Sequence, residues 1–362
     1  MEEMNNLNNQ EEEKEKKRGI FFIFESKNKR LYKLIFALIL LIGIFSVGTY
    51  AWFTSNYTVK VQQIDVTVAG GSGIQISTDA ENWKSMITLD DILNHAYSGA
   101  VNQVPSETAQ MNPVSTVKAG YTDATSKSAG LHMYRGTIVN DELTGDPYLD
   151  SVSETDATTN YDYIAFDLFL KLDFKESEGP KDVLFTSTTG VKAGDPNTHI
   201  EYASRMGFVV NGNAPSSSDL NTLRNLKGTT AVKIYEPNYD FHTSNGLDNG
   251  RDNYHITGRT TTGNTTPAPY YGVKAAFAYD ATDPTNNPGT PLDSTDANKF
   301  ALVEPDFKTT AANTNDFDFM SLPVGVTKIR VYMWIEGQDI DCENTASGGQ
   351  VQFNLGFKLN EP

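Results

Sequence analysis

The residues best suited to chemistry lie in one acidic stretch, Glu336-Gly-Gln-Asp-Ile-Asp-Cys-Glu343. It holds four carboxylates, at Glu336, Asp339, Asp341 and Glu343. Carboxylate and backbone carbonyl oxygens are the ligands that calcium prefers in proteins. The stretch therefore predicts a candidate calcium site in a loop between two strands, although it lacks the Asp-x-Asp-x-Asp-Gly ladder of a dedicated calcium loop. The alternative is a loop of solvated acids, and no cofactor other than calcium is expected.

Cysteine and histidine patterns give no support to catalysis. Cys342 is the only cysteine, which excludes an internal disulfide framework and every multi-cysteine zinc motif. The five histidines are scattered, without the His-Glu-x-x-His spacing of a zinc hydrolase. No histidine lies close to Cys342 in sequence to act as a base, so its thiol is expected to be a small apolar filler. The sequence thus predicts a protein that is not an enzyme.

An aromatic cluster follows one predicted strand, in the segment 234–243. Tyr235, Tyr239, Phe241 and His242 lie there beside Pro237, which ends the strand. Aromatic side chains with polar groups can bind carbohydrate or protein, and they can equally close the end of a β-sandwich. We favour the structural interpretation of this cluster.

Alternating apolar and polar residues predict the strands that must position these side chains. The clearest strand covers residues 164–174, where Asp167 and other charged residues share one face, so one buried and one solvated side are expected. The segments 329–335 and 351–359 alternate in the same way. We expect these two to pair antiparallel across the loop 337–349.

Further strands and a few short helices complete the predicted fold. Weaker strands are expected at 58–68, 73–77, 183–186, 206–210, 232–235, 273–279 and 300–303, and short helices at 88–95 and 219–226. A change of apolar parity between Val61 and Ile64 predicts a β-bulge or a strand that passes between sheets. Strands without intervening amphipathic helices favour an all-β, jelly-roll-like β-sandwich over residues 54–362. Two polar segments, about 100–160 and about 243–298, are expected to be insertions or long surface loops.

An uncharged apolar run over residues 34–53 is long enough to cross a bilayer as a helix. Basic residues precede it at Lys27, Lys29, Arg30 and Lys33, and such residues stay on the cytoplasmic side. Residues 1–33 are therefore expected to be a polar cytoplasmic extension, with the rest of the chain exported. Small residues at Thr49 and Ala51 fit the pattern that a signal peptidase reads, so cleavage after Ala51 is predicted. An uncut leader would instead anchor the protein in the membrane.

The charge distribution limits the partners of the exported part. The 362-residue chain has a net charge of −17, and the residues from Ala51 onward carry about −18. A body this acidic lacks the basic surface that displaces counterions from phosphates, so nucleic acid is not an expected partner. An acidic surface agrees with a soluble protein outside the cell.

The leader resembles a known class of exported proteins. Ser46-Val-Gly-Thr-Tyr-Ala-Trp-Phe-Thr54 is similar to the end of the SipW-type signal peptides of TasA and camelysin, proteins of Gram-positive bacteria exported with a dedicated signal peptidase. The segments Ile74–Trp83, Lys233–Asn238 and Tyr332–Cys342 are similar to a set of uncharacterised exported bacterial proteins with this leader. The resemblance to TasA and camelysin covers only residues 34 to about 68, and the rest of the chain departs from them.

This resemblance implies a structural protein of the biofilm matrix, because TasA-like subunits form fibres in which the first strand of one subunit completes the sheet of the next. The matching donor strand in this sequence would use Tyr57, Val59, Val61, Ile64, Val66 and Val68. Camelysin has been classed as a metallopeptidase, but this sequence has no metalloprotease motif, so that activity is not expected. An extracellular carbohydrate-binding module or hydrolase, and a type II membrane protein that displays a partner-binding domain, remain open alternatives.

Overall fold

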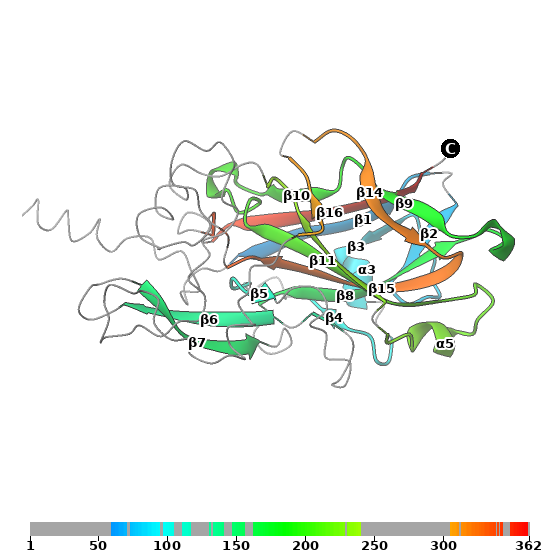
Figure 1. Cartoon of the computed structure of the whole chain (residues 1–362), viewed down its shortest axis with the longest axis horizontal. Helices are drawn as coiled ribbons and strands as arrows, with labels where there is room; N and C mark the ends of the chain where they lie inside the picture. Colours follow the sequence, from blue (N-terminus) through cyan, green and yellow to red (C-terminus); the bar gives the residue numbers. More distant parts are fainter. Residues whose placement is uncertain are drawn as a thin grey trace, which may run out of the picture. The chain divides into compact units, whose positions relative to one another are not determined.

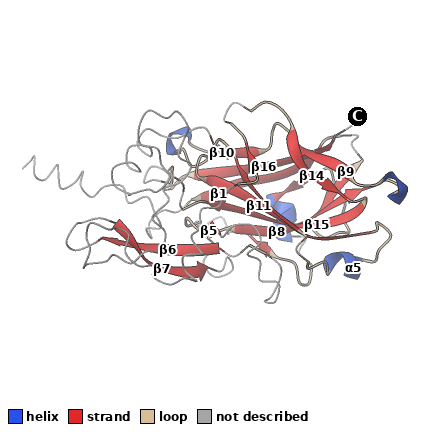
Figure 2. Ribbon diagram, in the orientation of Figure 1, coloured by secondary structure: helices blue, strands red, loops and turns tan. Residues whose placement is uncertain are grey.

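A computed structural model of the chain describes part of the sequence. The described residues are 59–70, 73–94, 97–104, 111–116, 130–131, 133–140, 147–155, 162–228, 230–239, 305–310, 313–337, 339, 341–342 and 348–360. They all belong to one unit, Tyr50–Pro362. Most of the ordered elements are strands (Figures 1 and 2), which confirms the predicted all-β class. Among the described residues no helix has the length and apolar character needed to cross a membrane, and the predicted leader at 34–53 lies outside them.

The first sheet has six strands and contains the first described strand of the chain. These strands are β1 (Lys60–Val68), β3 (Met86–Thr88), β9 (Lys181–Phe185), β10 (Gly190–Ala193), β14 (Phe317–Leu322) and β16 (Gln350–Leu359). Their order is β14-β9-β16-β1-β3, and β10 also pairs with β16. Strand β1 runs parallel to β16 and antiparallel to β3. Its pairing with β16 shifts register between Val61 and Gln63, which confirms the predicted bulge.

The second sheet has seven strands. They are β2 (Ile74–Ser77), β4 (Asn102–Gln103), β8 (Ile164–Leu172), β11 (Ser204–Ala214), β12 (Ala231–Glu236), β13 (Phe307–Lys308) and β15 (Gly325–Ile335). Their order is β13-β12-β11-β15-β8-β2, with β4 also paired to β8. The two long central strands, β11 and β15, pair antiparallel over almost their full length.

The two sheets share one apolar core, as in a β-sandwich. Buried side chains of β1 and β16, such as Ile64 and Phe353, belong to the same cluster as Phe166 and Phe208 of the second sheet. Phe185 is central to this core, with its ring centroid 5.3 Å from that of Phe208 and 4.4 Å from that of Phe319. Burial of this apolar surface is the main favourable contribution to folding.

Two predictions about the strongest strands are wrong. Strands β15 and β16 do not pair with each other, because they lie in different sheets and the loop between them crosses the sandwich. Strand β8 is buried on both faces instead of one, since Asp167 and Phe169 are as inaccessible as Phe166. Sequence alternation marked which residues share a face, but it could not show that other segments cover the second face.

The outer face of the second sheet is covered by segments from the predicted insertion near residues 100–160 and by a short helix. Val114, Leu131 and Met133 pack against Tyr332 and Trp334 of β15. The short helix is α5 (Leu220–Arg224), and its Leu223 lies in an apolar cluster with Phe169 of β8. Part of this insertion forms a separate three-stranded sheet of β5 (Ser115–Thr116), β6 (Met133–Asn140) and β7 (Pro147–Thr155).

Both predicted helices are present. Helix α3 spans Leu89–Asn94, and α5 begins after Asp219, whose carboxylate accepts a hydrogen bond from the Thr222 amide at 3.0 Å. That side chain satisfies a backbone donor which the helix leaves without an internal partner. Short 3₁₀ turns occur at Glu176–Glu178 and Pro196–Thr198. The predicted strands at 273–279 and 300–303 and the insertion 243–298 lie outside the described residues.

Candidate functional site

The described carboxylates of the acidic stretch are buried in the fold rather than solvated. Glu336, Asp339 and Asp341 are at most 2% exposed. The Trp334 indole donates a hydrogen bond to Glu336 at 3.0 Å. Asp339 forms an ion pair with Arg205, a buried residue of β11. The carboxylates of this stretch therefore serve in part as partners for buried donors.

Arg205 links this stretch to the predicted aromatic segment. Its guanidinium lies 2.7 Å from Glu236 at the end of β12, in addition to its pairing with Asp339. An arginine fork can engage two carboxylates at once, and burial makes each charge dependent on its partners. The three residues join β11, β12 and the segment after β15.

The calcium prediction stays a prediction. Glu343, the fourth proposed ligand, lies outside the described residues. In the part of the chain that the structure describes, no group of three or more His, Cys, Asp or Glu side chains is arranged to hold a metal ion. Cys342 is 2% exposed and belongs to the main apolar core, which agrees with its expected role as a small filler.

A second buried ionic cluster lies on the outer face of the second sheet, around Asp167 of β8. The Arg330 Nε atom lies 2.9 Å from Asp167 Oδ1, and the Lys328 Nζ atom lies 3.3 Å from Oδ2. The Tyr97 hydroxyl donates to Oδ2 at 2.6 Å. Burial lowers the pKa of Lys328, whereas the charge of Asp167 opposes that shift. The covering segments exclude water from these charged groups, and the ion pairs and hydrogen bonds within the cluster replace the contacts with water.

The predicted donor strand lies inside its own sheet. Ile64, Val66 and Val68 of β1 are buried in the core, and Val59 is joined to Met111 by an isolated bridge. Tyr57 lies outside the described residues. The structure thus gives the pairing of β1 within one chain, while its exchange between subunits stays a prediction.

The two edges of β1 differ in the length over which they are paired. Its parallel pairing with β16 extends from Lys60 to Val68, whereas its antiparallel pairing with β3 is confined to Asp65, Val66 and Thr67. β3 is a three-residue strand at the end of the sheet. After β1 the chain crosses to β2 in the second sheet, so β1 is connected to the described fold through this crossover.

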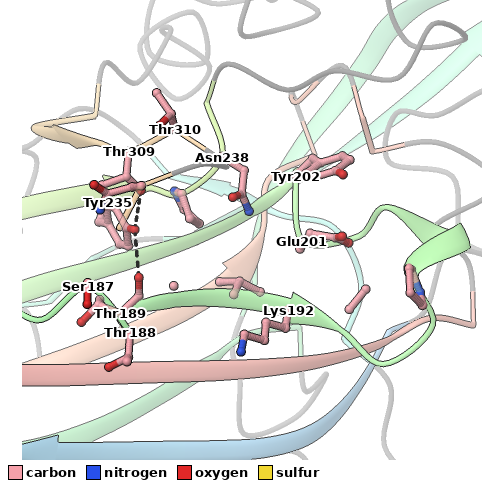
Figure 3. Close-up of a pocket in the computed structure, with 16 residues that line it drawn as sticks. Ser187, Thr188, Thr189, Lys192, Glu201, Tyr202, Tyr235, Asn238, Thr309 and Thr310 are labelled. Atoms are coloured by element: carbon pink, nitrogen blue, oxygen red, sulfur yellow. Dashed lines mark hydrogen bonds between the residues drawn. The ribbon is translucent and has the colours of Figure 1, made fainter. Parts of the chain in front are cut away.

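A pocket lies near the edges of both sheets (Figure 3). The turn after β9, strand β10 and the segment 196–202 form one side. The end of β12 and residues Thr309, Thr310 and Asn313 form the other. Its volume is about 580 Å³, within the range of roughly 300–1,000 Å³ usual for small-molecule sites.

The floor of the pocket is fixed by internal hydrogen bonds. The Tyr235 hydroxyl lies 2.6 Å from Thr309 Oγ1 and donates to the Thr189 carbonyl oxygen at 3.4 Å. The Thr189 hydroxyl in turn donates to the Gly356 carbonyl oxygen at 3.1 Å. Burial raises the pKa of Tyr235 to about 12, although its hydrogen bond with Thr309 lowers it. The hydroxyl therefore stays protonated, and the floor is a rigid polar surface.

The lining of the pocket includes one carboxylate with an unsatisfied oxygen and two other polar side chains. The Glu201 Oε2 atom is buried and has no hydrogen-bond partner. Burial raises the pKa of this carboxyl, opposed by the bond to its own backbone and by nearby His199. Asn238 extends from the end of β12 toward β10 (Figure 3), and Lys192 is exposed at the rim.

The aromatic segment therefore has two roles within the described residues. Tyr235 belongs to the sandwich core, as the structural interpretation predicted, and it also forms the pocket floor with Asn238 nearby in the wall. Phe241 and His242 lie outside the described residues. No sequence pattern pointed to Glu201, because this residue lies in a turn after the left-handed residue His199 and not in a recognisable motif.

Comparison of the chain with protein-family models, curated proteins and solved structures finds no match.

Proposed function

We propose that this protein is an exported structural subunit of the cell surface or extracellular matrix, and that its subunits join by exchange of β1. In this proposal a signal peptidase cuts after Ala51, which leaves a free end shortly before β1. The strand of one subunit then leaves its own sheet and inserts beside β16 of the next subunit. Addition of a strand to an open sheet edge gives affinity through main-chain hydrogen bonds.

The observation that carries the proposal is the position of β1 in its sheet. Withdrawal of β1 would expose the long edge of β16, whose opposite edge is already paired with β9 and β10. It would also open core positions filled by Ile64, Val66 and Val68. A second copy of the same strand matches both the hydrogen-bonding edge and the vacated apolar positions, so exchange creates an identical interface at low cost.

The finer parts of the proposal follow from the sequence. A jelly-roll connectivity is proposed for the sandwich, with the parallel β1–β16 pair as a departure from an all-antiparallel jelly roll. The leader is proposed to direct the body outside the cell, either released or membrane-anchored if it is not cut. A calcium ion at the acidic stretch would stiffen the loop before β16.

A reversible disulfide tests the exchange. Thr67 of β1 and Met86 of β3 are register partners in an antiparallel pair, and Met86 is 45% exposed. The double substitution Thr67→Cys/Met86→Cys would tie β1 to β3 of its own chain when oxidised, because directly opposite residues in antiparallel strands meet the distance that a disulfide needs. β3 leads directly into α3, whose Ile92 is buried in the core of the same subunit. We expect the oxidised protein to remain monomeric and the reduced protein to form oligomers or filaments, as measured by light scattering and electron microscopy.

A matched disulfide elsewhere in the sheet is the control. Asp182 of β9 and Ser321 of β14 are also antiparallel partners with exposed side chains. The variant Asp182→Cys/Ser321→Cys should assemble under both oxidising and reducing conditions, since it leaves β1 free. The proposal fails if the unmodified protein stays monomeric at high concentration, or if the oxidised β1–β3 disulfide leaves assembly unchanged.

A further inference from the structure

The pocket near the two sheet edges lies where the first sheet lacks a strand. β9 and β10 both pair with β16, and β9 has β14 as its next neighbour. Among the described residues β10 pairs only with β16, and all four of its residues line the pocket. Across the pocket lie Thr309, Thr310 and Asn313, which come shortly before β14 in the chain. The pocket is therefore a gap between the free edge of β10 and the segment that leads into β14.

The free edge of β10 presents backbone groups to this gap. Facing residues in an antiparallel pair of strands alternate between pairs that exchange hydrogen bonds and pairs that do not. The Gly194 amide donates to the Gln350 carbonyl oxygen at 2.7 Å, so Gly194 and, two residues earlier, Lys192 are in hydrogen-bonded pairs with β16. Val191 and Ala193 alternate with them, and their N–H and C=O groups therefore point away from β16. This edge offers a new strand two donors and two acceptors.

The opposite wall of the gap supplies further polar groups. Asn238 and Thr310 line the pocket, and within the described part of the chain their side chains make no hydrogen bond. Asn238 extends from the end of β12 toward β10 (Figure 3). An amide and a hydroxyl can each donate and accept hydrogen bonds. A strand in the gap could thus bond to β10 along one edge and to these side chains along the other.

The gap is open and its floor is preformed. A Cβ atom on Gly190, the first residue of β10, would meet no other atom within 4 Å. Glycine inside a strand often marks a place where another backbone approaches closely. Below the gap, Tyr235 and Thr309 are buried and hydrogen-bonded to each other. An incoming chain would therefore lose little free energy to ordering of the pocket.

The dimensions and lining of the gap narrow the class of chain that fits. β10 has four residues, so at about 3.3 Å per residue it can pair with about four residues of an extended segment. The backbone and inward side chains of that segment must share about 580 Å³, which favours small side chains. Hydroxyl groups of the lining, at Ser187, Thr188 and Thr310, suit partners that also carry hydroxyl groups. The net charge of −17 disfavours an acidic partner.

We propose that the free edge of β10 binds an extended segment of another protein, rich in serine and threonine and without acidic residues, as an added strand. Main-chain hydrogen bonds to Val191 and Ala193 provide the affinity, and the lining of the gap selects small side chains. No residue of β1 lines this pocket, so the binding is independent of strand exchange through β1.

Fluorescence anisotropy of a labelled peptide tests the proposal on the full chain. The probe is the heptapeptide Thr-Ser-Thr-Ser-Thr-Ser-Thr, with fluorescein at its N-terminus and an amidated C-terminus. We expect saturable binding. Methylation of alternate backbone amides of the peptide should weaken it about tenfold or more, because each methyl group removes a hydrogen-bond donor. A peptide with glutamate added at both ends should also bind more weakly.

A proline substitution tests the same hydrogen bonds from the side of the protein. Ala193→Pro removes an outward donor but no bond of the β10–β16 ladder, and proline is tolerated at such edge positions. It should weaken peptide binding about tenfold. Met86→Pro is the matched control at the far end of the same sheet. Because the Val68 amide donates to the Ser85 carbonyl oxygen, the Met86 amide points away from β1 by the same alternation. This variant should bind the peptide as the unmodified protein does, and circular dichroism should show that both variants are folded.

Hydrogen exchange provides an independent measurement. The Ala193 amide should exchange rapidly in the free protein and slowly with saturating peptide. Three results would overturn the proposal: no binding of the unmodified peptide at millimolar concentration, binding that neither amide methylation nor Ala193→Pro changes, or slow exchange of the Ala193 amide in the free protein, which would mean that the edge is already occupied. The oxidised β1–β3 disulfide variant should bind the peptide as a monomer, which distinguishes failure of this proposal from failure of the proposed assembly.

Discussion

Replacing Asp167 tests whether the outer face of the second sheet depends on its buried ionic cluster. Asp167→Asn keeps the shape of the side chain but removes the charge that faces Arg330 and Lys328, at 2.9 and 3.3 Å. Both cations are at most 5% exposed through their side chains. The substitution would therefore remove one counter-charge from two buried positive charges.

The size of the effect follows from this burial. Removing one partner of a buried ion pair costs about 3–5 kcal/mol, because the remaining charge stays out of water without compensation. We expect Asp167→Asn to lower the free energy of unfolding by about 3 kcal/mol, since the amide retains hydrogen bonds. Asp167→Ala should cost about 4 kcal/mol or more, because it also removes the acceptor of the Tyr97 hydroxyl.

The pH dependence of the stability of Asp167→Asn provides a second, independent test of the ionic cluster. Burial already lowers the pKa of Lys328, and loss of the Asp167 charge would lower it further. The folded state then binds fewer protons than the unfolded state below the ordinary lysine pKa, so stability rises with pH in that range. Asp167→Asn should thus recover part of its lost stability as the pH rises toward the ordinary lysine pKa of about 10.4.

Urea denaturation followed by tryptophan fluorescence measures both effects. Asp173→Asn is the control, because Asp173 is exposed immediately after β8 and its replacement should change stability by less than about 0.5 kcal/mol. A loss below about 1 kcal/mol for Asp167→Asn, with no change in its pH dependence, would refute the idea that these charges depend on one another.

Five other predictions concern stability and can be tested by unfolding measurements. Burial raises the pKa of the Asp79 carboxyl, but hydrogen bonds to its carboxylate outweigh this and lower the pKa to about 2. About 1–2 kcal/mol of stability should therefore be lost as the pH falls from about 4 to about 2. Asp79→Asn should abolish this pH dependence. Gly325 has a φ of 112°, and a Cβ there would collide with the Ala214 carbonyl oxygen, so Gly325→Ala should cost about 3 kcal/mol. Gly348→Ala, where φ is positive but the space is open, should cost about 1 kcal/mol. The raised pKa of Glu201 means that stability should fall as the pH rises above the ordinary glutamate pKa, and Glu201→Gln should remove this fall. If calcium binds the acidic stretch, millimolar calcium should raise the melting temperature relative to chelator, whereas an unchanged melting temperature would exclude a site there.

Local sequence patterns were sufficient to predict eight of the sixteen described strands, the long central ones among them, and both helices. Alternation located β8, β15 and β16, and a parity change located the bulge in β1, because side-chain direction along a strand is a local property. The short helix predicted at 219–226 corresponds to α5, which begins after its capping residue Asp219.

Long-range features could not be predicted in this way. Proximity in sequence favours pairing of β15 with β16, but a long intervening loop does not fix which sheet each strand joins. Burial of Asp167 depends on cover from residues near 97 and from α5, which no pattern within β8 could reveal. The pocket likewise joins Glu201 and Asn238 with residues near 190 and 310, so it exists only in the folded chain.

The parallel pairing of β1 with β16 also determines when the first sheet can close. Gln62 and Gln352, which are hydrogen-bonded through their side chains, lie 290 residues apart in sequence. Such a distant contact makes folding slow, because a large loop must close before the pairing stabilises the chain. During synthesis β1 is made long before β16. Its apolar residues therefore stay exposed in an incompletely folded chain, which makes that chain prone to aggregate. The strongly negative charge of the residues from Ala51 onward would then oppose aggregation, because incompletely folded chains repel one another until β16 has been synthesised.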